Sequence, residues 1–300
     1  RLRPNGAILN GIAMKLVTFS PSGSTPRIGA LDDAGVADLA VAAEGALPTR
    51  MIDLLARGEA GLRAAAAALR AAPSSAHHAL STLTLHAPVP RPGKILCLGR
   101  NYAAHAREGG AEVLEHPIIF LKPATAVIGP GAPIIVPAAT EKPDYEAELA
   151  VVIGRPCRDV PEARALDYVA GYTCANDVSA RDLQRLTHQW DQGKMLDTFC
   201  PLGPALVTAD EIGDPGGLEI SAHLNGQEMQ HSNTRLMIFS VPFFISYLSR
   251  LVTLEPGDIL LTGTPDGVGG ARTPPVFLQN GDTISITVEG IGTLSNPVQR

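Results

Sequence analysis

The chain has 300 residues, of which 45% are hydrophobic, 18% charged and 4% aromatic, and its formal net charge is −6. A mildly acidic chain with no basic stripe and few aromatic residues is not expected to bind nucleic acid. No apolar run is long enough to span a membrane and the four cysteines lie far apart, so we expect a cytoplasmic protein with reduced thiols and no membrane partner.

The N-terminal part of the chain predicts a small module of its own. Residues 1–13 precede Met14, which looks like a natural start, and are interpreted as a tag or upstream leader. Residues 14–85 combine strand-like runs, KLVTF and RIGALDDAGVADL, with the alanine-rich helical stretch MIDLLARGEAGLRAAAAALR. Prolines then mark a linker at 86–92. We therefore predict a small α+β domain ahead of a larger domain at 93–300.

The larger domain is predicted to be rich in strands. The runs KILCLG, PIIFLKP, APIIVP, EAELAVVIG and YVAGYTCANDV are apolar and are bounded by Gly, Pro, Asn or Asp. Helical patterns are fewer: NYAAHAREGG with an asparagine N-cap, PEARALDYV, and VPFFISYLSRLVTL. Near the C-terminus, LQNGDTISITVEGIGTLSNP predicts strands around an Asn-Gly turn. The pattern favours a β-rich α+β fold.

Two carboxylates open the run EAELAVVIG. Residues i and i+2 of a strand share one face, so Glu146 and Glu148 are expected to project together. Carboxylates this close repel each other and are costly to bury, and a bound divalent cation would relieve both effects. Hard oxygen ligands without His or Cys favour Mg²⁺, Mn²⁺ or Ca²⁺ over zinc. On spacing alone, a solvated strand end is an equally good interpretation.

Other charged residues extend this candidate site. Asp177 ends the run YVAGYTCANDV and could complete a three-carboxylate site if the two strands are neighbours. Lys194 and Arg181 are candidates for holding an anionic substrate, although each alone is more often a surface charge. Trp190 is interpreted as a packing residue beside the Lys194 loop.

Several motifs occur in an order that resembles the fumarylacetoacetate hydrolase family. They are GRNYAAHAREGG, PIIFLKPATAVIGPGAPIIVP, DYEAELAVVIG, DYVAGYTCANDVSARD, GKMLDTFCPLGP and LEPGDILLTGTPDGVG. The resemblance covers roughly residues 93–298, and the N-terminal module resembles the extra domain of bacterial acylpyruvase-like and 2-hydroxyhepta-2,4-diene-1,7-dioate isomerase-like members. It implies a fold of layered mixed sheets and a homodimer.

The resemblance also implies a ligand set and a substrate class. Glu146, Glu148 and Asp177 would hold Mg²⁺ or Mn²⁺, and the substrate would be a 2-oxo acid. Lys194 would bind or polarise the 2-oxo group, and Thr264 would contact the substrate carboxylate.

Four more residues receive roles from the same resemblance. Arg181 and Gln184 would line the substrate pocket. His105 and Glu108 lie at i and i+3, on one face of a short helix that resembles a mobile lid. Glu108 would orient the imidazole and His105 would activate water. The alternative is that His105 has only a structural role, which is the commoner role of a lone histidine in a helix.

The leading expectation for function is hydrolysis of a C–C bond in a 2,4-dioxo acid of the acylpyruvate or fumarylpyruvate type. The alternative is a decarboxylase or isomerase of 2-oxo diacids, of the oxaloacetate or homoprotocatechuate-pathway type. A non-catalytic metal-binding or ligand-binding module is a third interpretation, and the intact set of motifs argues against it. Where many relatives have G-K-S-F-D, this chain has Met195 and Leu196 in the middle, which weakens transfer of any one relative's substrate.

Overall fold

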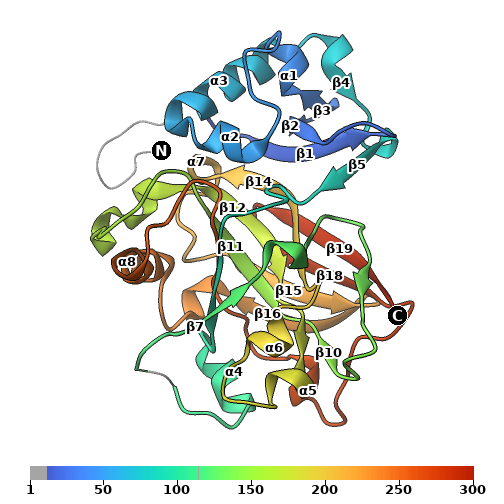
Figure 1. The fold of residues 1–300 in the computed structure, drawn as a ribbon, viewed down its shortest axis with the longest axis vertical. Helices are drawn as coiled ribbons and strands as arrows, with labels where there is room; N and C mark the ends of the chain where they lie inside the picture. Colours follow the sequence, from blue (N-terminus) through green and yellow to red (C-terminus); the bar gives the residue numbers. More distant parts are fainter. Residues whose placement is uncertain (1–11, 114) are drawn as a thin grey trace.

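The computed structural model describes residues 12–113 and 115–300 (Figure 1). The predicted leader, residues 1–13, therefore lies outside the described residues except for its last two. Ile12 is buried, and its carbonyl accepts a hydrogen bond from Thr208 Oγ1 at 3.3 Å.

A mixed sheet of twelve strands forms the centre of the described chain. Its main path runs through β4 (His77–His78), β3 (Gly35–Asp38), β2 (Arg27–Asp32), β1 (Lys15–Pro21), β14 (Cys200–Thr208), β12 (Val169–Asn176), β11 (Ala147–Ile153), β17 (Ile259–Leu261), β6 (Ile95–Gly99) and β7 (Ile118–Lys122). Beside this path, β5 (Leu83–His86) pairs with β1, and β8 (Val127–Ile128) pairs with β14. Most neighbours are antiparallel, whereas β17 runs parallel to β6 and β8 parallel to β14.

A second sheet packs on the central one. Its strands in order are β16 (Gln227–Asn233), β15 (Glu219–Leu224), β18 (Thr283–Val288), β19 (Gly292–Gln299) and β9 (Ile134–Ile135). The short strands β10 (Pro143–Asp144) and β13 (Ser179–Ala180) form a separate pair. The fold is thus α+β with layered mixed sheets, as the sequence predicts.

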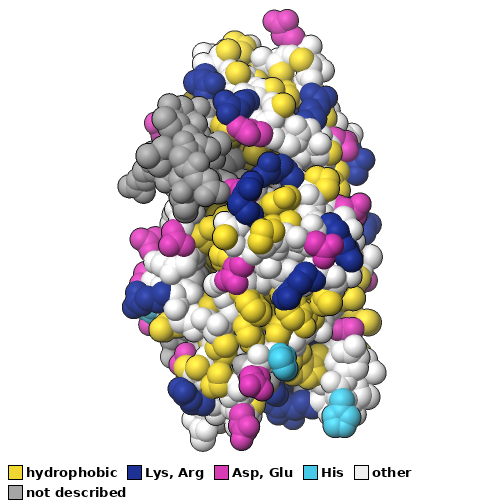
Figure 2. Space-filling model, turned by 90° about the vertical axis from the view of Figure 1, so that its left-hand side faces the viewer, with side chains coloured by type: hydrophobic (Ala, Val, Ile, Leu, Met, Phe, Trp, Pro, Cys, Tyr) yellow, Lys and Arg dark blue, Asp and Glu magenta, His cyan; other side chains and the backbone are white. Residues whose placement is uncertain are grey.

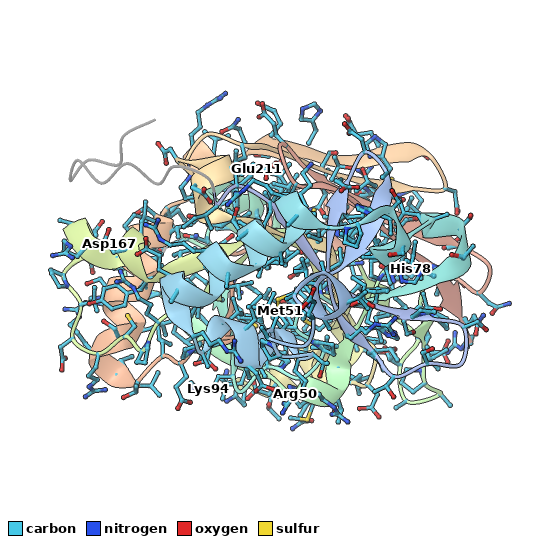
Figure 3. All side chains as sticks on the ribbon, turned by 90° about the horizontal axis from the view of Figure 1, so that it is seen from above. Arg50, Met51, His78, Lys94, Asp167 and Glu211 are labelled. Carbon is cyan, nitrogen blue, oxygen red and sulfur yellow. The ribbon has the colours of Figure 1, made fainter. Side chains whose placement is uncertain are left out.

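Helices occupy the two ends of the molecule and one side (Figure 1). The α-helices are α1 (Leu39–Ala42), α2 (Met51–Leu55), α3 (Gly58–Ala71), α4 (Ala103–Glu108), α5 (Arg181–Gln184), α6 (Asp191–Lys194), α7 (Ala209–Ile212) and α8 (Val241–Leu251). Six 3₁₀ turns are also described: η1 (Ser74–Ala76), η2 (Leu80–Thr82), η3 (Ala124–Ala126), η4 (Glu162–Tyr168), η5 (Thr234–Leu236) and η6 (Gly269–Ala271). Seen from above, α2 and α3 lie across the N-terminal end, where Met51 is buried (Figure 3). The helices α4, α5 and α6 lie at the opposite end.

Strand β11 is buried on both faces, which explains why all of its residues except Glu148 are apolar. Leu149 and Val151 belong to the core shared with the second sheet, whereas Ala150 and Val152 belong to the core that reaches the N-terminal helices. Because side chains alternate along a strand, Glu148 shares the face of Ala150 and Val152.

The N-terminal strands continue the central sheet rather than standing apart from it. In β1, Lys15 and Leu16 pair with Val207 and Leu206 of β14. The division into domains at 14–85, 86–92 and 93–300 stays a prediction.

Some local predictions differ from the structure. The first predicted helix is two helices, α2 and α3, because Gly58 adopts a φ of +59° where the second begins. The PEARALDYV segment forms the 3₁₀ turn η4. Asn101 does not cap α4, because its buried side chain instead bonds the backbone of Phe239 and Thr262. The turn at Asn280 precedes β18, and the β18–β19 connection lies further on.

The face that carries α8 shows hydrophobic side chains in groups between charged ones (Figure 2). On α8, the Phe243 ring stacks on Phe239 and Tyr247, with ring centroids 5.0 and 5.9 Å apart.

No helix in the described ranges has both the length and the apolarity to cross a membrane. The homodimer and the cytoplasmic location stay predictions.

Candidate active site and cation site

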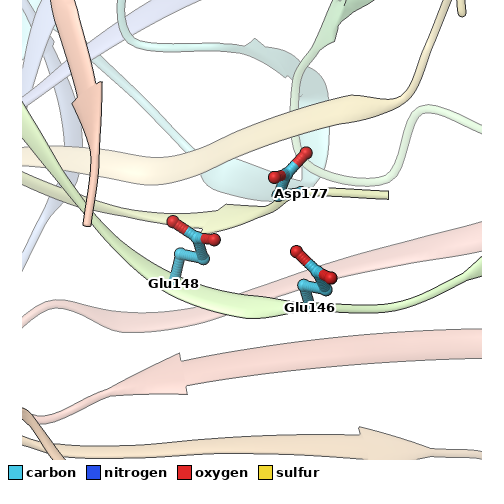
Figure 4. A group of neighbouring side chains, drawn as sticks. All are labelled: Glu146, Glu148 and Asp177. Atoms are coloured by element: carbon cyan, nitrogen blue, oxygen red, sulfur yellow. The ribbon is translucent and has the colours of Figure 1, made fainter. Parts of the chain in front are cut away.

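Neighbouring strand ends bring three carboxylates together. Strands β11 and β12 are antiparallel neighbours, with Glu148 opposite Ala175. Just beyond both strand ends, Asp177 N donates to Glu146 O at 3.0 Å. One oxygen from each of Glu146, Glu148 and Asp177 lies within 4.8 Å of the others, and all three residues are buried (Figure 4). The strand spacing inferred from sequence, together with the pairing of β11 and β12 on which the prediction was conditional, accounts for this convergence.

Three cations partly neutralise these acids. Lys194 Nζ on α6 lies 2.8 Å from Glu146 Oε2 and 2.7 Å from Asp177 Oδ2. Lys122 Nζ at the end of β7 lies 2.5 Å from Asp177 Oδ1, and Arg181 Nη1 lies 2.7 Å from Glu146 Oε1. Burial alone would raise the pKa of Glu146, but the charges of Lys194 and Arg181 outweigh it and lower that pKa.

Glu148 is less well compensated, although the charge of Lys194 acts to lower its pKa. Its Oε2 accepts a hydrogen bond from Gly263 N at 2.7 Å, and no cation of the described residues forms an ion pair with it. Burial raises the pKa of Glu148 well above its usual range, and the neighbouring charges of Asp177 and Glu146 raise it further. A buried carboxylate with unmet charge, in an all-oxygen donor set, fits a hard divalent cation. The residues present therefore suit the metal predicted from the sequence, without selecting between Mg²⁺, Mn²⁺ and Ca²⁺.

The pair His105 and Glu108 joins helix α4 to the loop after β17. His105 Nδ1 lies 2.7 Å from Glu108 Oε1, and Glu108 Oε2 accepts from Gly267 N at 2.8 Å. An ionised carboxylate can only accept, so a neutral His105 paired with it would carry its proton on Nδ1 and leave the lone pair on Nε2. Both side chains line the same cavity as Glu146 and Glu148. The arrangement can give or take a proton at Nε2.

Arg181 is held in the site by several polar groups. Its Nε donates to Asp144 Oδ2 at 2.8 Å, and its Nη1 donates to Gln184 Oε1 at 3.1 Å. Its Nη2 is buried and has no hydrogen-bond partner among the described residues. A buried guanidinium nitrogen without a partner is costly, so this atom is suited to an anionic ligand in the cavity.

Thr264 is oriented by Gln230 of β16. Gln230 Oε1 accepts from Ala147 N at 2.9 Å, and Gln230 Nε2 donates to Pro265 O at 2.8 Å and to Thr264 Oγ1 at 2.9 Å. A backbone N–H at one end and a carbonyl at the other fix which way the amide points. Since Thr264 Oγ1 accepts from Gln230, its own proton is free to be donated into the cavity.

One cavity of about 630 Å³ collects most of the predicted site residues. Its lining includes His105, Glu108, Glu146, Glu148, Arg181, Gln184, Lys194 and Thr264. Asp177 is fully buried beside it, bound to Lys122 and Lys194. The roles given to these residues stay predictions.

Three residues of the site escaped the sequence reasoning. Lys122 is a buried lysine near the end of the apolar run PIIFLKP. A lysine within such an apolar run was a sequence signal that could have pointed to it. Asp144 lies two residues before Glu146 and binds Arg181 and the backbone of Gly269 and Gly270. Gln230 has no local signal, because its partners come from two distant segments.

The fold and the site together define a β-rich protein with a buried carboxylate centre suited to a divalent cation. Residues 94–299 match the family model described as fumarylacetoacetate (FAA) hydrolase C-terminal. The chain therefore belongs to the fumarylacetoacetate hydrolase family.

Individual relatives differ in the reaction that they are named for. The chain is 47% identical over 294 residues to the mitochondrial oxaloacetate tautomerase fahd2 of Xenopus laevis, covering 96% of this chain and 91% of that protein. The structure resembles a 2-hydroxyhepta-2,4-diene-1,7-dioate isomerase from Mycobacterium marinum, with a TM-score of 0.74, 36% identity, and coverage of 96% of this chain and 98% of that one. It also resembles a maleylpyruvate hydrolase from Sphingobium sp. SYK-6 in complex with manganese(II) ion and pyruvate, with a TM-score of 0.79, 33% identity, and coverage of 95% and 99%.

These relatives include a tautomerase, an isomerase and a hydrolase, so family membership alone does not select one reaction. C–C bond hydrolysis, the leading expectation from the sequence, is supported only at the level of the family. The alternative expectation, an isomerase of 2-oxo diacids, agrees better with the tautomerase and isomerase relatives.

Proposed function

We propose that this protein is a divalent-cation-dependent tautomerase of a 2-oxo diacid of the oxaloacetate class. The observation that carries the proposal is the 47% identity to an oxaloacetate tautomerase over 96% of the chain. The His105–Glu108 pair and the three carboxylates around one cavity supply groups that such a reaction needs.

The 2-oxo acid end of the substrate is assigned to the part of the cavity lined by Arg181 and Thr264. Arg181 Nη2, buried and without a partner in the described chain, would donate to the substrate carboxylate. The Thr264 hydroxyl, whose proton is left free by Gln230, would donate to the same group. Held in this way, the substrate would present C2 and C3 to His105, which lies on α4 and lines the same cavity.

The reaction itself moves protons and breaks no C–C bond. In ketonisation the enol hydroxyl loses its proton to water, C3 gains a proton, and the C2–C3 double bond becomes a C2–O double bond. His105 Nε2 would take up a proton from water and deliver it to C3, and in the reverse direction it would remove the C3 proton and return it to water. Glu108 holds the ring through Nδ1 and stabilises the protonated imidazole while that proton is on Nε2.

The cation site is part of this proposal. A divalent cation held by Glu146, Glu148 and Asp177 would supply positive charge beside the oxygens of a bound 2-oxo acid. Lys194, which contacts Glu146 and Asp177, would keep those carboxylates in place and add positive charge.

Hydrolysis of a C–C bond is the second candidate. The likeness to the maleylpyruvate hydrolase from Sphingobium sp. SYK-6 favours it, since the same His105 could take a proton from water instead of from C3. Its 33% identity is lower than that to the tautomerase, so we rank hydrolysis second.

The test follows the products of three reactions with one protein sample. Enol-oxaloacetate is added to protein loaded with Mg²⁺ or Mn²⁺, and decay of the enol absorbance is compared with the spontaneous rate. Pyruvate release from oxaloacetate reports decarboxylation, and loss of maleylpyruvate or acetylpyruvate reports hydrolysis. Excess EDTA serves as the metal-free control.

The proposal expects fast metal-dependent ketonisation with no pyruvate released from oxaloacetate. Metal-loaded protein that leaves the enol decay at its spontaneous rate would reject the tautomerase. Consumption of maleylpyruvate or acetylpyruvate in that same sample would establish the hydrolase instead.

A further inference from the structure

One wall of the cavity has two aromatic rings between two cations. Lys194 Nζ, which contacts the carboxylate centre, lies 4.8 Å from the centroid of the Phe120 ring. The Phe120 and Trp190 rings lie 5.9 Å apart, and Arg100 Cζ lies 5.1 Å from the Trp190 ring. All four side chains line the cavity. The wall thus leads from one positive group at the carboxylate centre, past two aromatic rings, to a second positive group.

The local backbone holds Arg100 in this position. A Cβ on Gly99 would lie 2.4 Å from Trp190 Cζ3, so the Trp190 ring packs directly on the backbone there. Arg100 itself has a φ of +55°, a left-handed conformation that glycine would adopt at lower cost. The structure therefore fixes an arginine at a strained position, with its guanidinium stacked on an aromatic ring.

The positive charge at this end of the cavity is not compensated. Three acids line the cavity: Glu108, Glu146 and Glu148. Each already accepts a hydrogen bond or forms an ion pair with a group other than Arg100. Within the described residues, neither Arg100 nor Arg185, which also lines the cavity, forms an ion pair with a carboxylate. An arginine stacked on an aromatic ring keeps its planar fork of donors free to bind a carboxylate.

We propose that Arg100, stacked on Trp190, forms a second anion-binding position that recognises the distal carboxylate of a 2-oxo diacid. The inference rests on the proposed function in one respect, that the substrate carries two carboxylates. It assigns Trp190, interpreted from sequence as a packing residue, a further role as the platform for Arg100. Phe120 and Trp190 then face the carbon chain between the two charged ends.

The test compares two ligands that differ only at the distal end. Binding of 2-oxoglutarate and of 2-oxopentanoate to the Mn²⁺-loaded protein is measured by titration calorimetry for wild type, Arg100→Met and Arg250→Met. Arg250 is the matched control, because it stacks on Tyr247 at 5.5 Å and lines no part of this cavity. Arg100→Met should weaken 2-oxoglutarate binding by about 10- to 100-fold and leave 2-oxopentanoate unchanged. Arg250→Met should change neither.

Equal weakening of both ligands, or of neither, would overturn the second anion position. If Arg100→Met does not fold, Arg100→Lys replaces it, with the same selective loss expected to be smaller, since lysine keeps the charge but loses the planar fork. Because the readout is binding, it separates the two proposals. If Arg100→Met selectively loses 2-oxoglutarate binding but the wild-type protein has no tautomerase activity, the anion position is supported and the proposed function is rejected. If the wild-type protein is a tautomerase but Arg100→Met shows no selective loss, the proposed function is supported and the anion position is rejected.

Discussion

Glu148 is the residue at which burial and charge conflict most. Its carboxylate lies within a group of three, and burial together with Asp177 and Glu146 raises its pKa well above the usual range. Glu148→Gln keeps the shape and removes one of the mutually repelling charges. The metal-free variant should therefore be at least as stable as the wild-type protein, although a buried residue has been changed.

The same substitution should abolish stabilisation by metal. For wild type, Mn²⁺ at 100 times its dissociation constant should raise the free energy of unfolding by about 2.7 kcal/mol. Thermal unfolding with and without Mn²⁺ measures both effects, with Glu44→Gln, an exposed acid of the N-terminal module, as control. A Glu148→Gln protein that Mn²⁺ still stabilises fully would remove Glu148 from the cation site.

Gln230 acts on the site through its neighbours. Gln230→Leu leaves Ala147 N–H buried without its partner, and it frees the Thr264 hydroxyl to turn. We expect a loss of about 1–3 kcal/mol in unfolding free energy. We also expect KM to rise more than kcat falls, because substrate orientation is lost and the proton-transfer pair is intact.

Urea unfolding and steady-state kinetics check this prediction. Gln227→Leu, on an exposed position of the same strand, is the control. An unchanged KM with a lowered kcat would show that Gln230 does not act through Thr264.

At the scale of elements, helix α8 depends on a serine cap. Ser240 Oγ accepts from Phe243 N at 3.2 Å. Ser240→Ala should reduce the unfolding free energy by about 1 kcal/mol and leave activity unchanged, since α8 does not line the cavity. Urea unfolding of Ser240→Ala against Ser246→Ala, a serine within the same helix, is the comparison. Equal stability of the two variants would contradict the cap.

Elements were predictable from sequence where the pattern was long and local. The runs that became β11 and β12 are mostly apolar, and the antiparallel pairing of the two strands was enough to bring Glu146, Glu148 and Asp177 together. The exact start of a short helix was not predictable, even where the helix itself was expected, as in NYAAHAREGG. The helix α4 begins after Tyr102, because the Asn101 side chain bonds Thr262 and Phe239 far along the chain.

The same distinction applies to the site. Glu146 and Glu148 carry a signal in their spacing, whereas Gln230 joins Ala147 to Thr264 across segments with no mutual sequence signature. The lack of a partner for Arg181 Nη2 likewise results from packing, since it depends on the positions of all the side chains around that atom. Local geometry produces recognisable sequence patterns, whereas hydrogen bonds between distant segments produce no such pattern.

For the whole molecule, cysteine reactivity reports how closely the cores are packed. All four cysteines are buried and free. Burial raises the thiol pKa of Cys157 to about 11 and that of Cys174 and Cys200 to about 12, and raises that of Cys97 well above its usual range. Since the thiolate is the reactive form, the folded protein should react with a thiol reagent only slowly near neutral pH.

A disulfide reagent added to native and to guanidinium-denatured protein measures this difference. All four thiols should react at once when denatured and none at a comparable rate when native. A thiol that reacts rapidly in the native protein would contradict the packing around that cysteine.

The central claim is that His105 moves a proton at C3 of a 2-oxo diacid beside the carboxylate centre. The most direct measurement is ketonisation of enol-oxaloacetate in D₂O with Mn²⁺, trapped as malate by malate dehydrogenase and NADH and analysed by NMR. Wild type should place deuterium on one face of C3, whereas His105→Asn, which cannot deliver the proton, should be about 10²- to 10⁴-fold slower and give both faces, like the spontaneous reaction. Single-face labelling by His105→Asn at the wild-type rate, or labelling of both faces by wild type, would contradict the account.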